Sequence, residues 1–306
     1  MPVITTGNLD HEKLLLFEKN FERIATQKDT KLLNTPAVKF MDIKGISNIS
    51  RIDSNELVEV TGRNPKKQYV DIRNDNRKSV ASRYTATFLV DDYDKVVNLI
   101  TDPTSDLYMN LKEGRARRVD KCIAMAATAN VLVGAPDAAP TTVTAEEDGV
   151  MTIDGKTTFD YKNVISPAIT MFKNNYIDTT SGTTLAISAS EEQKLRDDEY
   201  YMNMFYSGNN TVDKGNITNA SGFNVVTFAG TQNGVNEIEL PILEESSGTR
   251  TNLLLAPHSI GFATEIGRLE VERAKDYVNS WEITIDLWVK AVRLQGQKVI
   301  KILSTI

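Results

Sequence analysis

The sequence has few of the residues on which enzyme sites and disulfide-bonded folds depend. It contains one cysteine, Cys122, and two histidines, His11 and His258. A single cysteine excludes an internal disulfide, and the histidines lack the spacing of a metal-binding pair. The chain also contains no GxGxxG, P-loop, nucleophile elbow or HExxH pattern. These absences argue against the common types of enzyme and cofactor site.

Long apolar runs are also absent, and basic charge is not in excess. No run is long enough to cross a bilayer, and the start, MPVITTGNLDHEK, lacks the apolar core of a signal peptide. The formal net charge of −6 argues against a protein that wraps nucleic acid, because phosphate binding requires a concentrated basic surface. With 41% hydrophobic and 25% charged residues, we expect a folded globular protein. Because it has a single cysteine and no signal peptide, we expect it to be made in a reducing compartment, the cytoplasm.

An amphipathic helix is predicted over residues 10–28. Asp10 suits the N-cap, and apolar residues recur at spacings of three and four: Leu14, Phe17, Phe21 and Ile24. The following stretch, residues 26–40, is polar and offers little to cover this stripe. Two arrangements fit: the helix packs on its own domain, or it is an arm that packs on another copy of the chain.

Residues 48–90 have the pattern of strands and turns, which predicts a long exposed hairpin. Its segment 73–83 is too polar for a core. This region contains only two acidic residues, Asp71 and Asp75. It contains seven basic residues: Arg63, Lys66, Lys67, Arg73, Arg77, Lys78 and Arg83. This basic ribbon is either a solvated loop or a surface that docks on acidic residues of a neighbour, such as those near Glu146 or Asp197, because opposite charges fix register.

A long helix is predicted over residues 103–133. Asp102 suits the N-cap, Pro103 the first helical position, and Asp106 favours the helix dipole. An apolar stripe continues along it: Leu107, Leu111, Val119, Ile123 and Ala126. Gly134 supplies the stop. Gly114 could divide the segment into two helices.

Further elements follow from turn and capping signals. We expect a hairpin around Asp154 and Gly155, a helix over residues 160–175 disturbed at Pro167, and a strand followed by a helix over residues 183–206 capped by Ser188 or Ser190. Short strands are expected from GFNVVTFAG to TNLLLAP, and a helix is expected to open at His258. The strongest strand signal is an alternating stretch with one buried face: Trp281, Ile283, Ile285, Leu287, Val289 and Ala291. A final short strand follows Gly296.

Candidates for chemistry are weak. Cys122 lies among alanines and fits a small buried residue better than a nucleophile. The carboxylates of residues 146–148 and 197–199 leave a glycosidase-like pair open, although such clusters are usually solvated.

The order of these parts resembles the tailed-bacteriophage major capsid proteins, which have the Johnson-type capsid fold. The resemblance rests on the arm, the basic hairpin, DDYDKVVNLITDPTS before a helix ending AMAATANVLVG, and LLLAPHSIGFATEIGRLEVE before the long terminal strand. It is best over residues 89–134 and 253–303. The resemblance implies an α+β fold with these parts: N-terminal arm 1–47, extended β-hairpin loop 48–88, peripheral domain 89–159 with a spine helix 103–133, axial α/β domain 160–256, and returning long strands 257–306.

The same resemblance implies a structural protein with no enzymatic activity, cofactor or metal. The chain would self-assemble as pentamers and hexamers into an icosahedral shell around double-stranded DNA, without sequence-specific DNA binding and without a membrane. It would be synthesised in the host cytoplasm and reside in the virion, with a portal, decoration proteins and a separate scaffold protein, or no scaffold, because no leader extension is visible. The residues expected to contact other subunits are Leu14, Phe17, Phe21, Ile24, Arg63, Lys66, Lys67, Arg73, Arg77 and Lys78. Lys66, Lys67 and Lys78 lie where some members form a covalent cross-link.

Three alternatives remain open from the sequence. A nanocompartment or gene-transfer particle would share the fold and differ in its cargo. A soluble carboxylate-based hydrolase would require a deep polar cleft. An adhesin-like virion module would be all-β and would lack the long helix.

Overall fold

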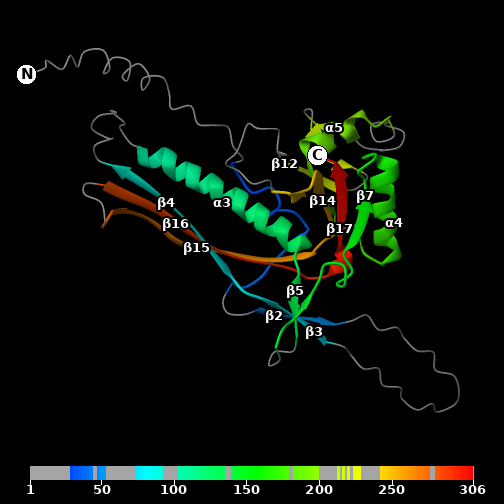
Figure 1. Ribbon diagram of the computed structural model, residues 1–306, viewed down its shortest axis with the longest axis horizontal. Coiled ribbons are helices and arrows are strands. Elements are labelled where there is room, and N and C mark those ends of the chain that lie inside the picture. Colours follow the sequence, from blue (N-terminus) through cyan, green and yellow to red (C-terminus); the bar gives the residue numbers. More distant parts are fainter. Residues whose placement is uncertain are drawn as a thin grey trace, which may run out of the picture. The chain divides into compact units, whose positions relative to one another are not determined.

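The computed structural model describes residues 28–43, 47–52, 74–91, 103–134, 139–178, 182–199, 212–213, 216–217, 219–220, 223–228, 242–275 and 280–305 (Figure 1). The chain divides into two compact units. Of the described residues, those within 28–30, 82–119 and 264–289 form the first unit, and those within 31–81, 120–263 and 290–305 form the second. The predicted helix 10–28 and the predicted strands within residues 53–73 lie outside the described residues.

The long helix α3 (Pro103–Thr128) begins at the predicted proline and continues through Gly114 as one element. It ends earlier than the predicted residue 133, because Val131–Val133 form strand β5. This run is Val-Leu-Val, and β-branched residues fit a pleated strand better than a helix. The helix therefore has 26 residues, which corresponds to about 39 Å at 1.5 Å per residue.

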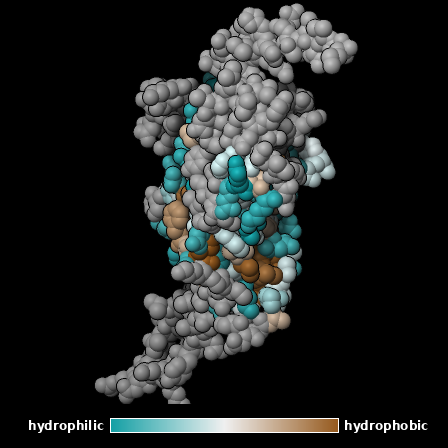
Figure 2. Space-filling model, turned by 90° about the vertical axis from the view of Figure 1, so that its left-hand side faces the viewer, coloured by the Kyte–Doolittle hydropathy of each residue, from teal (hydrophilic) through white to brown (hydrophobic). Residues whose placement is uncertain are grey.

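In the first unit, α3 packs against a long antiparallel pair. Strands β16 (Ser280–Arg293) and β4 (Ser82–Asp91) pair in register from Ser280 opposite Asp91 to Val289 opposite Ser82. Leu111 of α3 contacts Ile283 and Ile285 in a small core. The predicted apolar face of β16 is confirmed at Ile283 and Ile285. On the opposite face of β16, Lys290 and Val292 are also buried. Figure 2 shows hydrophobic patches among the hydrophilic side chains on one face of the molecule.

The second unit is built around a seven-stranded sheet with the order β11-β12-β8-β14-β17-β7, to which β13 adds beside β14. The strands are β7 (Met151–Asp154), β8 (Thr183–Ser188), β11 (Asn219–Ala220), β12 (Phe223–Phe228), β13 (Glu245–Ser246), β14 (Thr249–Leu255) and β17 (Val299–Thr305). The central strands β8, β14 and β17 are largely buried. They therefore form the hydrophobic centre of this unit.

One face of this sheet is covered by the predicted helix. A π-helical turn η1 (Tyr161–Ile165) leads into α4 (Ser166–Asn174), and the Asp160 side chain caps the start by accepting a hydrogen bond from the Asn163 N–H. Pro167 lies in the first turn of α4, so the expected disturbance is the change from π to α geometry. Ala168 and Phe172 pack in the main core with residues of the sheet: Leu185, Ile187, Leu254, Ile300 and Ile302.

The following helix, α5 (Ala189–Asp197), begins after β8 as predicted, with Ser188 at the N-cap position. Two predicted elements are wrong. No hairpin forms at Asp154 and Gly155, because β7 pairs with β17 in parallel and Gly155 donates a backbone hydrogen bond to Leu303. No helix opens at His258, because the stretch after it forms strand β15 (Ile260–Arg273).

Residues 28–43 are integrated into the body more closely than their polar sequence predicts. Both carboxylate oxygens of Asp120 accept backbone N–H groups, from Lys31 at 2.9 Å and from Leu32 at 3.0 Å. Leu32 is completely buried. Strand β1 (Val38–Phe40) then pairs in parallel with β15. The start of the described chain is thus fixed to α3 and β15.

The base of the predicted hairpin is present. Strands β2 (Ser47–Ile52) and β3 (Asn74–Ser79) pair antiparallel, from Ser47 opposite Ser79 to Ile52 opposite Asn74. We call these two strands the hairpin root. β3 also pairs with β5, and β5 with β6 (Thr141–Val143), in a four-stranded sheet of order β2-β3-β5-β6.

Candidate functional site: a buried charge cluster at the hairpin root

Only two of the ten residues expected to contact other subunits, Arg77 and Lys78, are described by the structure. The others lie outside the described residues: Leu14, Phe17, Phe21, Ile24, Arg63, Lys66, Lys67 and Arg73. Arg77 lies on β3, in the segment 73–83 that was predicted to be too polar for a core and part of an exposed hairpin. Its side chain is completely buried. The prediction that this segment is too polar for a core is therefore wrong at Arg77.

Arg77 is held by a carboxylate of its own chain. Its two terminal nitrogens bind the two oxygens of Asp148, with Nη1 to Oδ2 at 3.0 Å and Nη2 to Oδ1 in closer contact. Arg293, the last residue of β16, donates from Nε to the same Oδ2 at 2.7 Å. Asp148 is only 5% exposed and Arg293 is completely buried. Asp148, Arg77 and Arg293 form what we call the Asp148 cluster.

Backbone carbonyls complete the cluster. Arg77 Nη1 donates to the Arg293 carbonyl at 2.7 Å, and Arg293 Nη1 donates to the carbonyls of Ala127 and Ala129 at 2.9 and 2.8 Å. Ala127 lies in the last turn of α3, where carbonyls lack helical partners and the dipole favours a cation. Burial lowers the pKa of the Arg293 guanidinium, and Asp148 opposes that shift. The cluster therefore joins β3, β16 and the end of α3.

Local backbone structure brings Asp148 to this position. It lies in the turn between β6 and β7, where Thr144 and Glu147 exchange side-chain to backbone hydrogen bonds and Gly149 adopts a positive φ of 88°. Gly296 packs directly on this turn, since an added Cβ would lie 2.6 Å from the Asp148 carbonyl carbon and 2.8 Å from Oδ2. A side chain at position 296 would displace the carboxylate.

A second buried charge network lies at the start of α5. Arg250 donates to Glu191 at 3.1 Å and to Glu245 at 2.6 Å, and Ser304 donates to Glu191 at 2.8 Å. Glu191 is completely buried. Burial alone raises the pKa of Glu191, but hydrogen bonds from Ser188 and Ser304 and the charge of Arg250 outweigh it, so the net pKa lies below its ordinary value.

This shift predicts acid sensitivity of the folded subunit. A carboxyl with a lowered pKa stabilises the fold when ionised, and that stabilisation is lost as the pH falls through the folded-state pKa. We expect the free energy of unfolding to fall once the pH drops below about 4.3, the ordinary glutamate value. The Glu191→Gln variant should be less stable at pH 7 and lose less on acidification, as measured by urea unfolding at each pH. Equal acid slopes for the two proteins would contradict this role of Glu191.

Groups suited to catalysis or metal binding do not stand out in the described chain. His258 is an exposed turn residue with a φ of 54°, and Cys122 is half-buried. Among the residues that the structure describes, no three His, Cys, Asp or Glu side chains are grouped to hold a metal ion, and no helix is long and apolar enough to cross a membrane. Asp198, from the second acidic run, accepts the backbone N–H of Tyr161 at 2.6 Å.

Comparison with known proteins decides the family. A family model described as phage capsid protein matches residues 13–306. The chain belongs to the phage capsid protein family. No curated protein matches this capsid protein significantly. The family match means that the chain is a structural major capsid protein that forms a shell as a homo-oligomer in the virion.

Solved structures support the same fold for this capsid protein. The capsid of the cyanophage P-SCSP1u matches with a TM-score of 0.62 at 13% identity, covering 93% of this chain and 91% of that one. A Mycobacterium phage Che8 structure gives 0.61 at 15% identity, with 93% and 97% coverage. The capsid of the Helicobacter pylori bacteriophage KHP30 gives 0.63 at 8% identity, with 94% coverage of each chain. The predicted α+β capsid fold is confirmed.

The family match does not test the individual contact residues, but the structure changes the role expected of one of them. Arg77 makes its ionic contact inside the subunit, so it is removed from the set expected to reach a neighbour. Its partner Asp148 belongs to the acidic run, residues 146–148, that was expected to receive the ribbon of another copy. Glu146 and Asp197 remain exposed.

Proposed function

We propose that this capsid protein assembles through pentamers and hexamers into an icosahedral shell around double-stranded DNA. The observation that carries the proposal is the family match over residues 13–306. The charge of the chain supports it, because a net charge of −6 lets a shell contain DNA without binding phosphate tightly. In this proposal the role of the chain is structural, without catalysis, and it is synthesised in the host cytoplasm.

The proposal includes the division into arm, extended loop, peripheral domain, axial domain and returning strands. Portal, decoration and, where needed, separate scaffold proteins would complete the particle. The paired root of the hairpin supports the extended loop, because β2 and β3 pair side by side and residues 53–73 connect them in the sequence. That connection includes four basic residues: Arg63, Lys66, Lys67 and Arg73. In this proposal they bind an acidic surface of a neighbour, such as that near Glu146 or Asp197.

A charge reversal tests both the assembly and the loop. The purified chain should form closed particles tens of nanometres across in negative-stain micrographs, and in infected or co-expressing cells these should protect DNA from nuclease. The combined Arg63→Glu, Lys66→Glu, Lys67→Glu and Arg73→Glu variant should lose most of its particles while retaining the urea midpoint of the unassembled subunit. A Lys162→Glu variant, exposed on η1, serves as the control.

The outcomes separate the alternatives. Particles that contain an enzyme in place of DNA would indicate a nanocompartment. Normal particles from the reversed variant would refute the docking of the basic loop. A monomeric wild-type chain under all assembly conditions would refute shell formation.

A further inference from the structure

Tyr176 occupies an unfavourable position at the end of α4. The Tyr176 N–H binds the Lys173 carbonyl at 3.1 Å, and the Ile177 N–H binds the Phe172 carbonyl at 3.0 Å. These two bonds define a Schellman motif, in which the residue in the left-handed conformation is usually glycine. Tyr176 has a φ of 54°. A bulky residue in this conformation is strained, so the choice of tyrosine lowers the stability of the subunit.

The subunit gains no packing in return. The Tyr176 side chain is 98% exposed, whereas the next residue, Ile177, packs against the main core. An exposed aromatic side chain at a strained position suggests a function outside the subunit. Tyrosine is a frequent anchor of protein interfaces, because it supplies a large contact area with few rotatable bonds.

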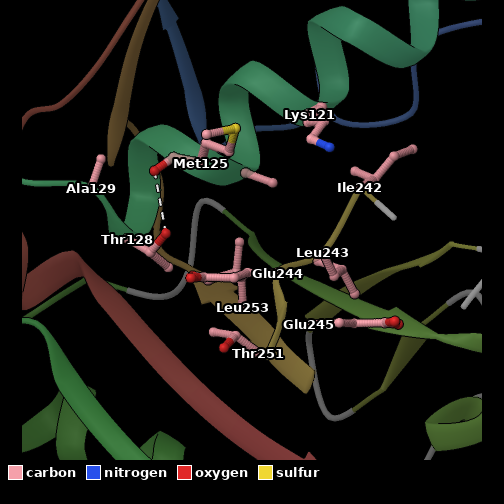
Figure 3. A pocket seen from close by; sticks show the side chains of 11 residues that line it. Lys121, Met125, Thr128, Ala129, Ile242, Leu243, Glu244, Glu245, Thr251 and Leu253 are labelled. Atoms are coloured by element: carbon pink, nitrogen blue, oxygen red, sulfur yellow. Dashed lines mark hydrogen bonds between the residues drawn. The ribbon is translucent and has the colours of Figure 1, made fainter. Parts of the chain in front are cut away.

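A groove of matching character lies elsewhere in the same unit (Figure 3). It has a volume of about 370 Å³ and is lined by α3 on one side and residues 242–253 on the other. Its apolar lining includes Ala124, Met125, Leu243 and Leu253. We call it the Leu253 groove. Met125 is 53% exposed there, and its flexible thioether packs well against aromatic rings.

Tyr176 and the Leu253 groove lie on opposite faces of one sheet. On strand β14, Leu254 packs in the core that includes Phe172 of α4, whereas Leu253 lines the groove. Successive strand residues point to opposite faces, so the sheet separates α4 from the groove. Figure 1 likewise shows α4 on the side of β17 that is away from the end of α3. Within one chain the tyrosine therefore cannot enter the groove.

We propose that Tyr176 of one copy inserts into the Leu253 groove of the next copy around a capsomer. Two different surfaces on opposite faces form a head-to-tail contact, which closes into a ring when the rotation fits. Charge supports the second copy as the occupant. Lys173 is exposed in the last turn of α4, beside Tyr176, and the groove is lined by two glutamates, Glu244 and Glu245, and by one lysine, Lys121. The inference rests on the proposed shell and names the contact that would join its subunits.

Replacing the tyrosine with glycine separates stability from assembly. The Tyr176→Gly variant should unfold at a higher urea concentration than the wild-type subunit, because the strain is removed, and should form capsomers and particles at least tenfold less efficiently. Asn174→Ala, at an exposed position of the same helix end, is the control and should assemble normally. Normal assembly by Tyr176→Gly would overturn the inference, as would a loss of assembly accompanied by a loss of stability.

A photo-cross-link identifies the partner surface directly. Tyr176→p-benzoylphenylalanine keeps an aromatic side chain, and benzophenone reacts readily with methionine. After irradiation of assembled particles, we expect covalent oligomers and a cross-linked peptide that contains Met125 or residues 242–253. Particles whose cross-links lie elsewhere, or that give none, would overturn the inference and leave the proposed function intact. A failure of the wild-type chain to form particles would instead remove the proposed function and this contact with it.

Discussion

The Asp148→Ala variant should be destabilised by roughly 3–5 kcal/mol, the usual cost of removing one partner from a buried ion pair. The substitution leaves the guanidinium groups of Arg77 and Arg293 buried without their shared carboxylate. Urea unfolding of the unassembled subunit, followed by circular dichroism, measures the loss. Particle yield should fall with it, because the hairpin root is no longer held against β16 and α3.

The control for this prediction is the neighbouring acidic residue Glu146, which is exposed. Glu146→Ala should change stability by no more than about 0.5 kcal/mol. In addition, Arg77→Met should cost less in the Asp148→Ala background than in the wild type, because the two side chains interact directly. Additive effects, or an Asp148→Ala loss no larger than that of Glu146→Ala, would contradict the assigned role of the cluster.

The Gly296→Ala variant should be destabilised by about 1–3 kcal/mol, the usual cost of overpacking. The new methyl group would overlap the backbone of the Asp148 turn and approach its carboxylate, so the turn must shift and the ion pairs weaken. Differential scanning calorimetry or urea unfolding measures this loss.

Gly114→Ala is the matched control, because it makes the same change on α3, where the nearest described atom to the added Cβ is Arg117 Nη2 at 3.8 Å. Alanine is the better helix former, so this variant should be more stable by about 0.5–1 kcal/mol. If both glycine variants change stability in the same direction, the close approach of Gly296 to Asp148 is not the cause of the change in Gly296→Ala.

Arg77 also changes how the basic ribbon should be tested. A combined reversal of Arg73, Arg77 and Lys78 to glutamate would not separate assembly from folding, because Arg77 is buried against Asp148. In the structure, a carboxylate at position 77 would lie buried beside Asp148, so the subunit itself would unfold. Reversals confined to Arg63, Lys66, Lys67 and Arg73 avoid this confusion of folding with assembly.

Local signals predicted single elements well. Pro103 marked the start of α3, Asp160 capped the helix before α4, and strict alternation identified β16. Each depends on neighbouring residues along the chain, so each is visible in sequence. The errors arose where distant strands decide the outcome: the backbone at Gly155 binds Leu303, and the stretch after His258 pairs with β1, so a hairpin and a helix were predicted wrongly.

The Asp148 cluster shows the same limit for the candidate site. The sequence identified a basic run that contains Arg77 and an acidic run that contains Asp148 as candidate surfaces for contact between copies. It did not show that they meet within one chain, because the two residues are 71 positions apart. Burial of a charged residue also depends on a partner that periodicity does not reveal. Likewise, the sequence predicts the end of this helix near residue 175, but the positive φ of Tyr176 is visible only in the structure.

Cryo-electron microscopy of the particle formed by the purified chain tests the central claim most directly. We expect a closed shell in which the Asp148 cluster is intact inside each subunit, while residues 53–73 lie on an adjacent copy. A particle in which each copy folds its hairpin and its first helix onto its own body, or a protein that remains a separate monomer, would contradict this account.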